Sequence, residues 1–239
     1  MNIALIGYGK MGKAIEEIAI QRGHQVMMRI GTANRHELNP GNLRRADVVI
    51  EFTRPDAARQ NVLECLDAGI PVVCGTTGWN DGLPAAKMKA VENDTALLWA
   101  SNFSVGVNIF FEVNKLLASL MNGRQEYEVS MEEIHHTQKK DSPSGTAISL
   151  AEQVIDSLDN KKHWIEGPTT NPELLPIHTQ RIDPYPGTHS VKYHSAIDDI
   201  EIIHTAHNRK GFATGAVLAA EFIAGKKGIF EMKDVLGIR

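Results

Sequence analysis

Hydrophobic residues in the first hundred positions form short apolar runs, each of a length suited to a buried strand. These runs cover residues 2–6, 24–30, 47–53, 70–74 and 95–100. Between the runs, apolar residues recur at three- and four-residue spacing, which is typical of amphipathic helices. The helical segments cover residues 13–22, 56–68 and 84–92. This alternation predicts an α/β domain built on a parallel sheet.

The second half of the chain has a different pattern, typical of an α+β domain in which two helices back an open mixed sheet. Strands are predicted over residues 126–134, 190–194 and 201–206, and the two helices over 105–120 and 142–155. A further apolar helix is predicted over 213–224, near the end of the chain. Residues 159–188 are rich in Asn, Asp, Pro, Thr and Gly, so we expect a long connecting loop there. The apolar stripe of the helix over 105–120 comprises Val105, Ile109, Val113, Leu116, Leu117 and Leu120.

A glycine motif, Gly7-Tyr-Gly-Lys-Met-Gly12, follows the first strand directly and opens the first helix. A strand, GxGxxG and a helix within about thirty residues form the Rossmann dinucleotide fingerprint. In this motif Gly7 permits the tight turn, Gly9 lets the backbone approach a pyrophosphate, and Gly12 lets the helix pack close to the strand. The first domain is therefore predicted to be a Rossmann-like dinucleotide-binding domain.

The end of the second strand bears on the choice of cofactor. NAD-selective sites usually place Asp or Glu there to hold the ribose hydroxyls. This chain has no carboxylate between Met28 and Arg35, and Arg29 and Arg35 could instead contact a 2′-phosphate. For either arginine alone, a solvent-facing loop position is an equal alternative. The missing acid favours NADPH, or use of both NADPH and NADH.

One stretch, residues 133–147, combines proton-transfer and anion-binding chemistry. His135 and His136 stand at a predicted strand end, and a histidine takes or gives a proton near neutral pH. Lys139 follows in a short polar loop and supplies positive charge. The stretch Ser142-Pro-Ser-Gly-Thr146 then starts a helix, whose free N–H groups suit an anion. The alternative is an ordinary turn with a capped helix start, but the combination favours a functional site.

Composition excludes several classes of function. The 239 residues carry a net charge of −4, so no basic surface for nucleic acid is indicated. The sequence has no apolar run of about 18 residues and no signal-peptide pattern at its start, so we expect a cytoplasmic protein without a membrane span. Cys65 and Cys74 are expected to be reduced thiols. The histidines lack metal-ligand spacing, so no metal site is predicted.

The string HHxxKxDxPSGTA, which begins at His135, resembles the signature of the 4-hydroxy-tetrahydrodipicolinate reductase (dihydrodipicolinate reductase) family, and the resemblance extends over nearly the whole chain. It implies reduction of a cyclic hydroxylated dicarboxylate by NAD(P)H, with loss of water, in diaminopimelate and lysine biosynthesis. His135 would be the general acid, with Lys139 as the nearby cation. His136 would bind substrate, and Ser144, Gly145 and Thr146 would hold one carboxylate.

The same resemblance extends the expected cofactor site beyond the glycine motif. Phe52-Thr-x-Pro is similar to a family turn, with Glu51 in place of the aspartate, and Gly75-Thr-Thr-Gly78 is similar to a loop along the cofactor. Ala100 to Phe103 resemble the hinge that touches the cofactor. The expected cofactor-binding residues are Gly7, Tyr8, Gly9, Lys10, Met11, Gly12, Arg29, Phe52, Gly75, Thr76, Thr77, Ala100, Ser101, Asn102 and Phe103.

The resemblance also implies the domain organisation. Residues 1–103 and 210–239 would form the dinucleotide-binding domain, and residues 104–209 a domain for substrate binding and assembly into a homotetramer. Asn208 to Lys210 would be the second hinge between the two. Two rival interpretations remain: another two-domain NAD(P) dehydrogenase, and a dinucleotide-sensing protein without catalysis. An aspartate-semialdehyde dehydrogenase would need a nucleophilic cysteine, and residues 135–147 contain none.

Overall fold

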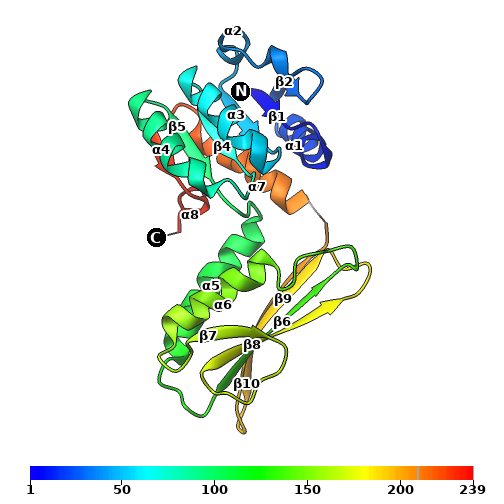
Figure 1. Cartoon of the computed structure of the whole chain (residues 1–239), viewed down its shortest axis with the longest axis vertical. Coiled ribbons are helices and arrows are strands. Elements are labelled where there is room, and N and C mark those ends of the chain that lie inside the picture. The colour runs from blue at the N-terminus through cyan, green and yellow to red at the C-terminus, as the bar shows by residue number, and fades with distance from the viewer. Residues whose placement is uncertain (209, 239) are drawn as a thin grey trace. The chain divides into compact units, whose positions relative to one another are not determined.

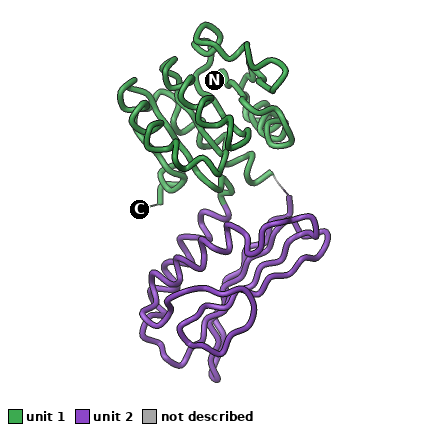
Figure 2. Tube along the Cα trace, viewed as in Figure 1, with its two compact units in different colours: residues 1–105, 209–239 green, residues 106–208 purple. Residues whose placement is uncertain are grey.

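The structure, a computed structural model, describes residues 1–208 and 210–238, so Arg209 of the expected second hinge lies outside the described residues. The chain forms two compact units, which Figure 2 colours green and purple. Unit 1 comprises residues 1–105 and 209–239, and unit 2 comprises residues 106–208. Among the described helices, none is long and apolar enough to cross a membrane.

Unit 1 is built on a six-stranded sheet with the order β11-β5-β4-β3-β1-β2, in which every neighbouring pair is parallel. Its strands are β1 (Asn2–Ile6), β2 (Gln25–Ile30), β3 (Val48–Glu51), β4 (Val72–Cys74), β5 (Ala96–Trp99) and β11 (Gly228–Phe230). The predicted Rossmann-like α/β fold is confirmed. The sixth strand, β11, was not predicted, because it has only three residues and begins with Gly228, which gives no clear period.

Helices cover both faces of this sheet (Figure 1). On one face, α1 (Lys10–Gln21) and α7 (Lys210–Ile223) pack against Ile3 and Leu5. On the other, α3 (Pro55–Asp67) and α4 (Leu83–Glu92) pack against Ala4 and Ile6. Because successive residues of a strand point to opposite faces, one five-residue run supplies both cores. Shorter helical segments complete the unit: η1 (Arg35–Glu37), α2 (Pro40–Leu43), η2 (Asn80–Gly82) and α8 (Met232–Val235).

The strand order reverses at β1, because β2 lies on one side of it and β3 on the other. Ligands of open α/β sheets bind outside the carboxyl ends of the strands at such a reversal. The loops that leave this point begin at Gly7, after β1, and at Phe52, after β3. Backbone hydrogen bonds fix both starts, from Gly7 N to Ile30 O (2.8 Å) and from Phe52 N to Ile6 O (2.8 Å).

Unit 2 contains a five-stranded mixed sheet with the order β10-β9-β6-β8-β7, as predicted for an open mixed sheet. The strands are β6 (Glu128–His135), β7 (His163–Glu166), β8 (Leu174–Arg181), β9 (Gly187–His194) and β10 (Asp199–Ala206). Strand β8 is parallel to β6 and β7, and the other pairs are antiparallel. The prediction of a continuous loop over 159–188 is wrong: β7 and β8 lie within it. β7 has only four residues, and Pro176 and Thr179 concealed the alternation of β8.

Two helices, α5 (Val105–Met121) and α6 (Gly145–Ser157), back this sheet. The predicted stripe of α5 is largely wrong, because Leu116 is 62% exposed and Leu120 is 63% exposed. The helix instead buries Phe110, Asn114 and Ala118. Asn114 is tolerated there because its amide donates to Leu150 O of α6 (3.1 Å). Because Asn114 is polar, the helical spacing of apolar residues did not indicate the buried face of α5.

We expect Gly215→Ala to lower the stability of unit 1. A Cβ at Gly215 would lie 1.7 Å from the carbonyl oxygen of Phe103, so α7 would have to shift. Overpacking of this kind costs about 1–3 kcal/mol. Urea unfolding followed by tryptophan fluorescence measures it. Gly211→Ala in the same helix is the control, because its Cβ would meet Ser104 Oγ at an ordinary 3.5 Å. Equal stability of the two variants would contradict the close approach.

Candidate active site

The glycine motif of unit 1 has the geometry of a tight turn with one open side. Gly7 has φ +96° and a Cβ there would lie 1.9 Å from Phe52 O, so only glycine fits. A Cβ at Gly12 would lie 2.2 Å from Gly7 O, whereas one at Gly9 would meet nothing within 4 Å. Among the described residues, no partner accepts the N–H groups of Lys10 and Met11. The open side and the free donors suit a pyrophosphate.

The loops after β3 and β4 are held by a buried carboxylate. Glu51 is fully buried and accepts a hydrogen bond from Thr76 Oγ1 at 2.7 Å. Phe52 lies so close to Gly75 that a Cβ there would be 2.1 Å from the ring. Thr77 is exposed. The Thr76 side chain therefore has a structural role, and the accessible groups of this loop belong to its backbone and Thr77.

The Ala100–Phe103 stretch also contains one buried structural side chain and several accessible residues. Phe103 is 2% exposed and packs in the first core of unit 1, where its ring centroid lies 5.5 Å from that of Phe52. Ala100 and Asn102 are half-buried and Ser101 is exposed. Within this stretch, Ala100, Ser101 and Asn102 are accessible to a ligand and Phe103 is not.

Neither predicted phosphate-binding arginine is a free cation in the structure. Arg29 forms an ion pair with Glu16 of α1, and Arg35 pairs with Glu64 of α3 at 2.7 Å. Tyr8, inside the glycine motif, donates from its hydroxyl to the same Glu16 carboxylate. Sequence reasoning missed these partners because the helix and the strand meet only in the folded unit.

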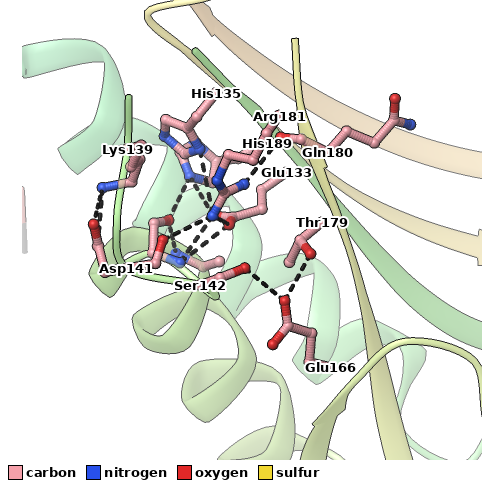
Figure 3. A network of polar contacts seen from close by, with 12 residues as sticks. Glu133, His135, Lys139, Asp141, Ser142, Glu166, Thr179, Gln180, Arg181 and His189 are labelled. Atoms are coloured by element: carbon pink, nitrogen blue, oxygen red, sulfur yellow. Dashed lines mark hydrogen bonds and ion pairs between the residues drawn. The ribbon is translucent and has the colours of Figure 1, made fainter. Parts of the chain in front are cut away.

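In unit 2, a buried carboxylate organises the 133–147 stretch (Figure 3). Glu133 is fully buried and accepts hydrogen bonds from Ser144 N (3.0 and 3.2 Å) and from Arg181 Nη2 (2.9 Å). The same Arg181 nitrogen donates to Asp141 O at 2.7 Å. Burial alone would raise the pKa of Glu133, but contacts with His189, Ser144 and Arg181 lower that pKa to about 2. Glu133 is thus a charged anchor for the loop.

His135 ends β6 and lies beside this anchor. Its Nδ1 is buried, has no hydrogen-bond partner among the described residues and lies 3.6 Å from Glu133 Oε2, and its ring is 5.0 Å from that of His189. On the other side, a Cβ at Gly187 would lie 2.9 Å from Nε2, so glycine makes room for the imidazole. Burial, followed by the charge of His189, lowers the pKa of His135 to about 4. The free protein therefore holds His135 neutral at pH 7.

Lys139 and His136 lie in the turn that follows. Lys139 Nζ pairs with both oxygens of Asp141 at 2.9 Å, and its charge is among the causes that lower the pKa of His135. The backbone N–H of Lys139 donates to His136 O at 3.1 Å, which closes the turn. Thr137 ties the turn to Asp183 through its hydroxyl at 2.7 Å. His136 is half-buried.

The three residues at the start of α6 have different roles. Ser144 is 2% exposed, and its hydroxyl accepts from Ala147 N (3.2 Å) as the helix N-cap. That hydroxyl also contacts His189 Nε2 at 3.1 Å. Gly145 and Thr146 are accessible, and among the described residues no partner accepts their N–H groups. The backbone of Gly145 and Thr146 is therefore the part of this start that can hold an anion.

Glu133, Arg181 and His189 are residues whose roles sequence reasoning missed. His189 stands opposite Glu133 in the antiparallel β6–β9 pair, and Arg181 stands beside His135 in the parallel β6–β8 pair. The register brings all three to one face of the sheet. β8 was not predicted, and the strand predicted over 190–194 began after His189, so no strand pairing could place Arg181 or His189.

The donor atoms of Glu133, His135 and His189 lie within 4.8 Å of one another, as in a metal site. The Glu133 oxygens already accept from Ser144 and Arg181, and the Arg181 guanidinium would repel a cation. We interpret the group as a buried polar network, and the sequence-based expectation of no metal stays a prediction.

The pKa of His135 predicts a pH-dependent stability. The unfolded chain takes a proton at this histidine near pH 6.5, whereas the folded chain does so near pH 4. Stability is thus lost as the pH falls from 6.5 through 4. We expect His135→Gln to abolish about 2 kcal/mol of the loss between pH 7 and pH 5 in urea unfolding. His178→Gln, at an exposed site of β8, is the control. Parallel pH profiles of wild type and His135→Gln would contradict a neutral, buried imidazole.

Comparisons with known proteins match this chain to one kind of reductase over nearly its full length. A family model described as the N-terminus of dihydrodipicolinate reductase matches residues 1–103, and one for the C-terminus matches residues 106–236. A curated relative from Christiangramia forsetii, named 4-hydroxy-tetrahydrodipicolinate reductase, is 50% identical over 237 residues, covering 99% of this chain and 98% of its own. One of the same name from Chromobacterium violaceum is 39% identical over 202 residues, covering 81% and 74%.

Among solved structures, the dipicolinate-bound dihydrodipicolinate reductase from Paenisporosarcina sp. TG-14 has the same fold. Its TM-score is 0.78 at 20% identity, and the match covers 97% of both chains. With both family models matched and half of the residues identical to a curated relative over almost the full length, the chain belongs to the dihydrodipicolinate reductase family.

Proposed function

We propose that this chain reduces 4-hydroxy-2,3,4,5-tetrahydrodipicolinate to 2,3,4,5-tetrahydrodipicolinate with NAD(P)H and loss of water, a step of diaminopimelate and lysine biosynthesis. The family match supports the reaction, since both halves of the reductase are present. The observation that carries the proposal is the grouping of His135, Lys139 and the open start of α6 in one network of unit 2 (Figure 3). A proton donor, a cation and an anion cradle are what reduction of a cyclic dicarboxylate requires.

His135 is proposed as the general acid. Its pKa near 4 leaves it neutral before substrate arrives. A bound dicarboxylate brings negative charge beside the imidazole, which favours the protonated form and raises its pKa. Glu133, 3.6 Å from Nδ1, supports the same charged form. Substrate binding would thus favour the protonated form of His135, which can then donate its proton to the substrate ring.

Lys139 is proposed as the cation that polarises the bound ring, and His136 as a further contact to substrate. Lys139 would exchange Asp141, which is mostly exposed, for a substrate carboxylate. The free N–H groups of Gly145 and Thr146 would hold a carboxylate at the positive end of the thirteen-residue helix α6. Ser144 would support them as the cap, since its own hydroxyl is buried.

In unit 1, the residues present fit a dinucleotide. The open face at Gly9 and the free N–H groups of Lys10 and Met11 would hold the pyrophosphate. Phe52, the backbone of Gly75 to Thr77, and Ala100 to Asn102 would line the nicotinamide half. When bound, the reduced nicotinamide supplies the hydride.

Assembly and location extend the proposal. We propose a homotetramer in the cytoplasm, as the resemblance implies. Unit 2 exposes large apolar side chains, among them Ile203 of β10 (60%) and Leu116 of α5 (62%), which further copies of the chain would cover. The free, buried thiols of Cys65 and Cys74 accord with a reducing compartment.

We expect His135→Ala and Lys139→Ala each to lower kcat by about 10²–10⁴-fold, because a positioned acid or cation acts mainly on the reacting ring. Dinucleotide binding, measured by calorimetry, should stay near the wild-type value, since both residues belong to unit 2. The matched controls are His178→Ala and Lys140→Ala, which remove exposed residues of the same types. Near wild-type turnover of either site variant would remove that residue from the mechanism.

A further inference from the structure

The charge at the end of β2 governs which dinucleotide a Rossmann-like domain prefers. In this chain the position holds Arg29, whose side chain is 41% exposed. Its Nε donates to Glu16 Oε1 at 2.7 Å, and its Nη2 donates to the same oxygen. Because two nitrogens of the guanidinium donate to one carboxylate oxygen, the positive charge of Arg29 is already balanced by Glu16. Arg29 is therefore not a ready partner for a 2′-phosphate.

Glu16 lies between the glycine motif and the end of β2. It stands in the second turn of α1, and its side chain is only 13% exposed. Its other oxygen, Oε2, accepts a hydrogen bond from the hydroxyl of Tyr8, which stands between Gly7 and Gly9. The Arg29 hydrogen bond is the main cause that lowers the pKa of Glu16, so the carboxylate is charged at neutral pH. Helix α1 thus brings a negative charge to the place where the adenosine ribose of a bound dinucleotide would lie.

This arrangement affects the two cofactors differently. A 2′-phosphate could reach Arg29 only beside the Glu16 carboxylate, where like charges repel. Drawing Arg29 away instead would leave a mostly buried carboxylate with Tyr8 as its remaining hydrogen-bond donor among the described residues. An unphosphorylated ribose meets neither obstacle, and its hydroxyls can donate to a carboxylate. The end of β2 carries no carboxylate for the ribose hydroxyls, and Glu16 supplies one from helix α1.

We infer that Glu16 is a specificity-determining residue, which pairs with Arg29 and thereby disfavours a 2′-phosphate, so that the chain binds NAD(H) at least as readily as NADP(H). The inference rests on the dinucleotide site of the proposed function. It revises the expectation from sequence that the missing acid after β2 favours NADPH. Arg35 does not replace Arg29, because it is paired with Glu64 at 2.7 Å.

The test is calorimetric titration of the full-length protein with NADP⁺ and NAD⁺, which needs no substrate. Glu16→Gln keeps the shape of the side chain and removes its charge. We expect this variant to raise affinity for NADP⁺ relative to NAD⁺ by about tenfold, and the gain to shrink in high salt. Adding Arg29→Ala to Glu16→Gln should abolish the gain, because the freed guanidinium causes it.

Glu17→Gln is the matched control. It removes the same charge from the next residue of α1, but Glu17 is exposed and its partners are Gln21 and Lys210. We expect its effect on the affinity ratio to be well below that of Glu16→Gln. If both variants raised the relative affinity for NADP⁺ by a similar factor, the cause would be the less negative net charge of the protein, and the inference would be overturned.

An unchanged ratio in Glu16→Gln would also overturn the inference, and a lower ratio would show that Glu16 orients Arg29 toward the phosphate. These outcomes differ from failure of the proposed function. Tight binding of either dinucleotide without turnover would remove the reductase activity and leave the role of Glu16 intact. Binding of neither dinucleotide by the wild type would defeat both.

Discussion

A carboxylate taken out of water must be surrounded by donors, and in unit 2 Glu133 meets this requirement with groups from other parts of the sequence. Ser144 supplies its backbone N–H, Arg181 its guanidinium, and His189 an imidazole 3.7 Å away. These residues come from the start of α6, from β8 and from β9. One buried charge thereby fixes where the helix begins relative to three strands. The position of His135 and the free N–H groups of α6 follow from this anchor.

Unit 1 uses the same device with a different result. Glu51 is the buried last residue of β3, and its Oε2 accepts hydrogen bonds from Thr76 Oγ1 (2.7 Å) and Cys74 Sγ (3.2 Å), so the strand ends and the loops that follow them are held together. Glu16 of α1 is also mostly buried, with 13% of its side chain exposed, and it pairs with Arg29. Glu51 holds the backbone of two loops in place, whereas Glu16 pairs with a cation, and this pairing is the basis of the proposed preference between the two dinucleotides. Glu51 stands at the end of β3 and Glu16 pairs with Arg29 near the end of β2, and a dinucleotide is expected outside these strand ends.

Much of the fold is predictable from the sequence, because buried parallel strands are short apolar runs and Gly7 and Gly12 leave no room for side chains. The string from His135 to Ala147, on which the resemblance to the family rests, is equally visible in the sequence. The predictions were wrong where polar residues occupy positions that a simple pattern assigns to apolar ones. Asn114 lies in the buried face of α5, and β7 and β8 together carry Pro, Thr and charged residues. The roles of Glu16, Arg181 and His189 depend on contacts between distant segments, and a single sequence carries no record of such contacts.

The most direct test of the reductase account is the absorbance of reduced nicotinamide, followed while the substrate is generated in place from pyruvate and aspartate semialdehyde by its synthase. The account predicts that the purified protein consumes NADH or NADPH only when the synthase and both of its substrates are present. It also predicts that the consumption is lost in His135→Ala. Tight dinucleotide binding without consumption of either cofactor would contradict the account and favour a sensor that kept the fold.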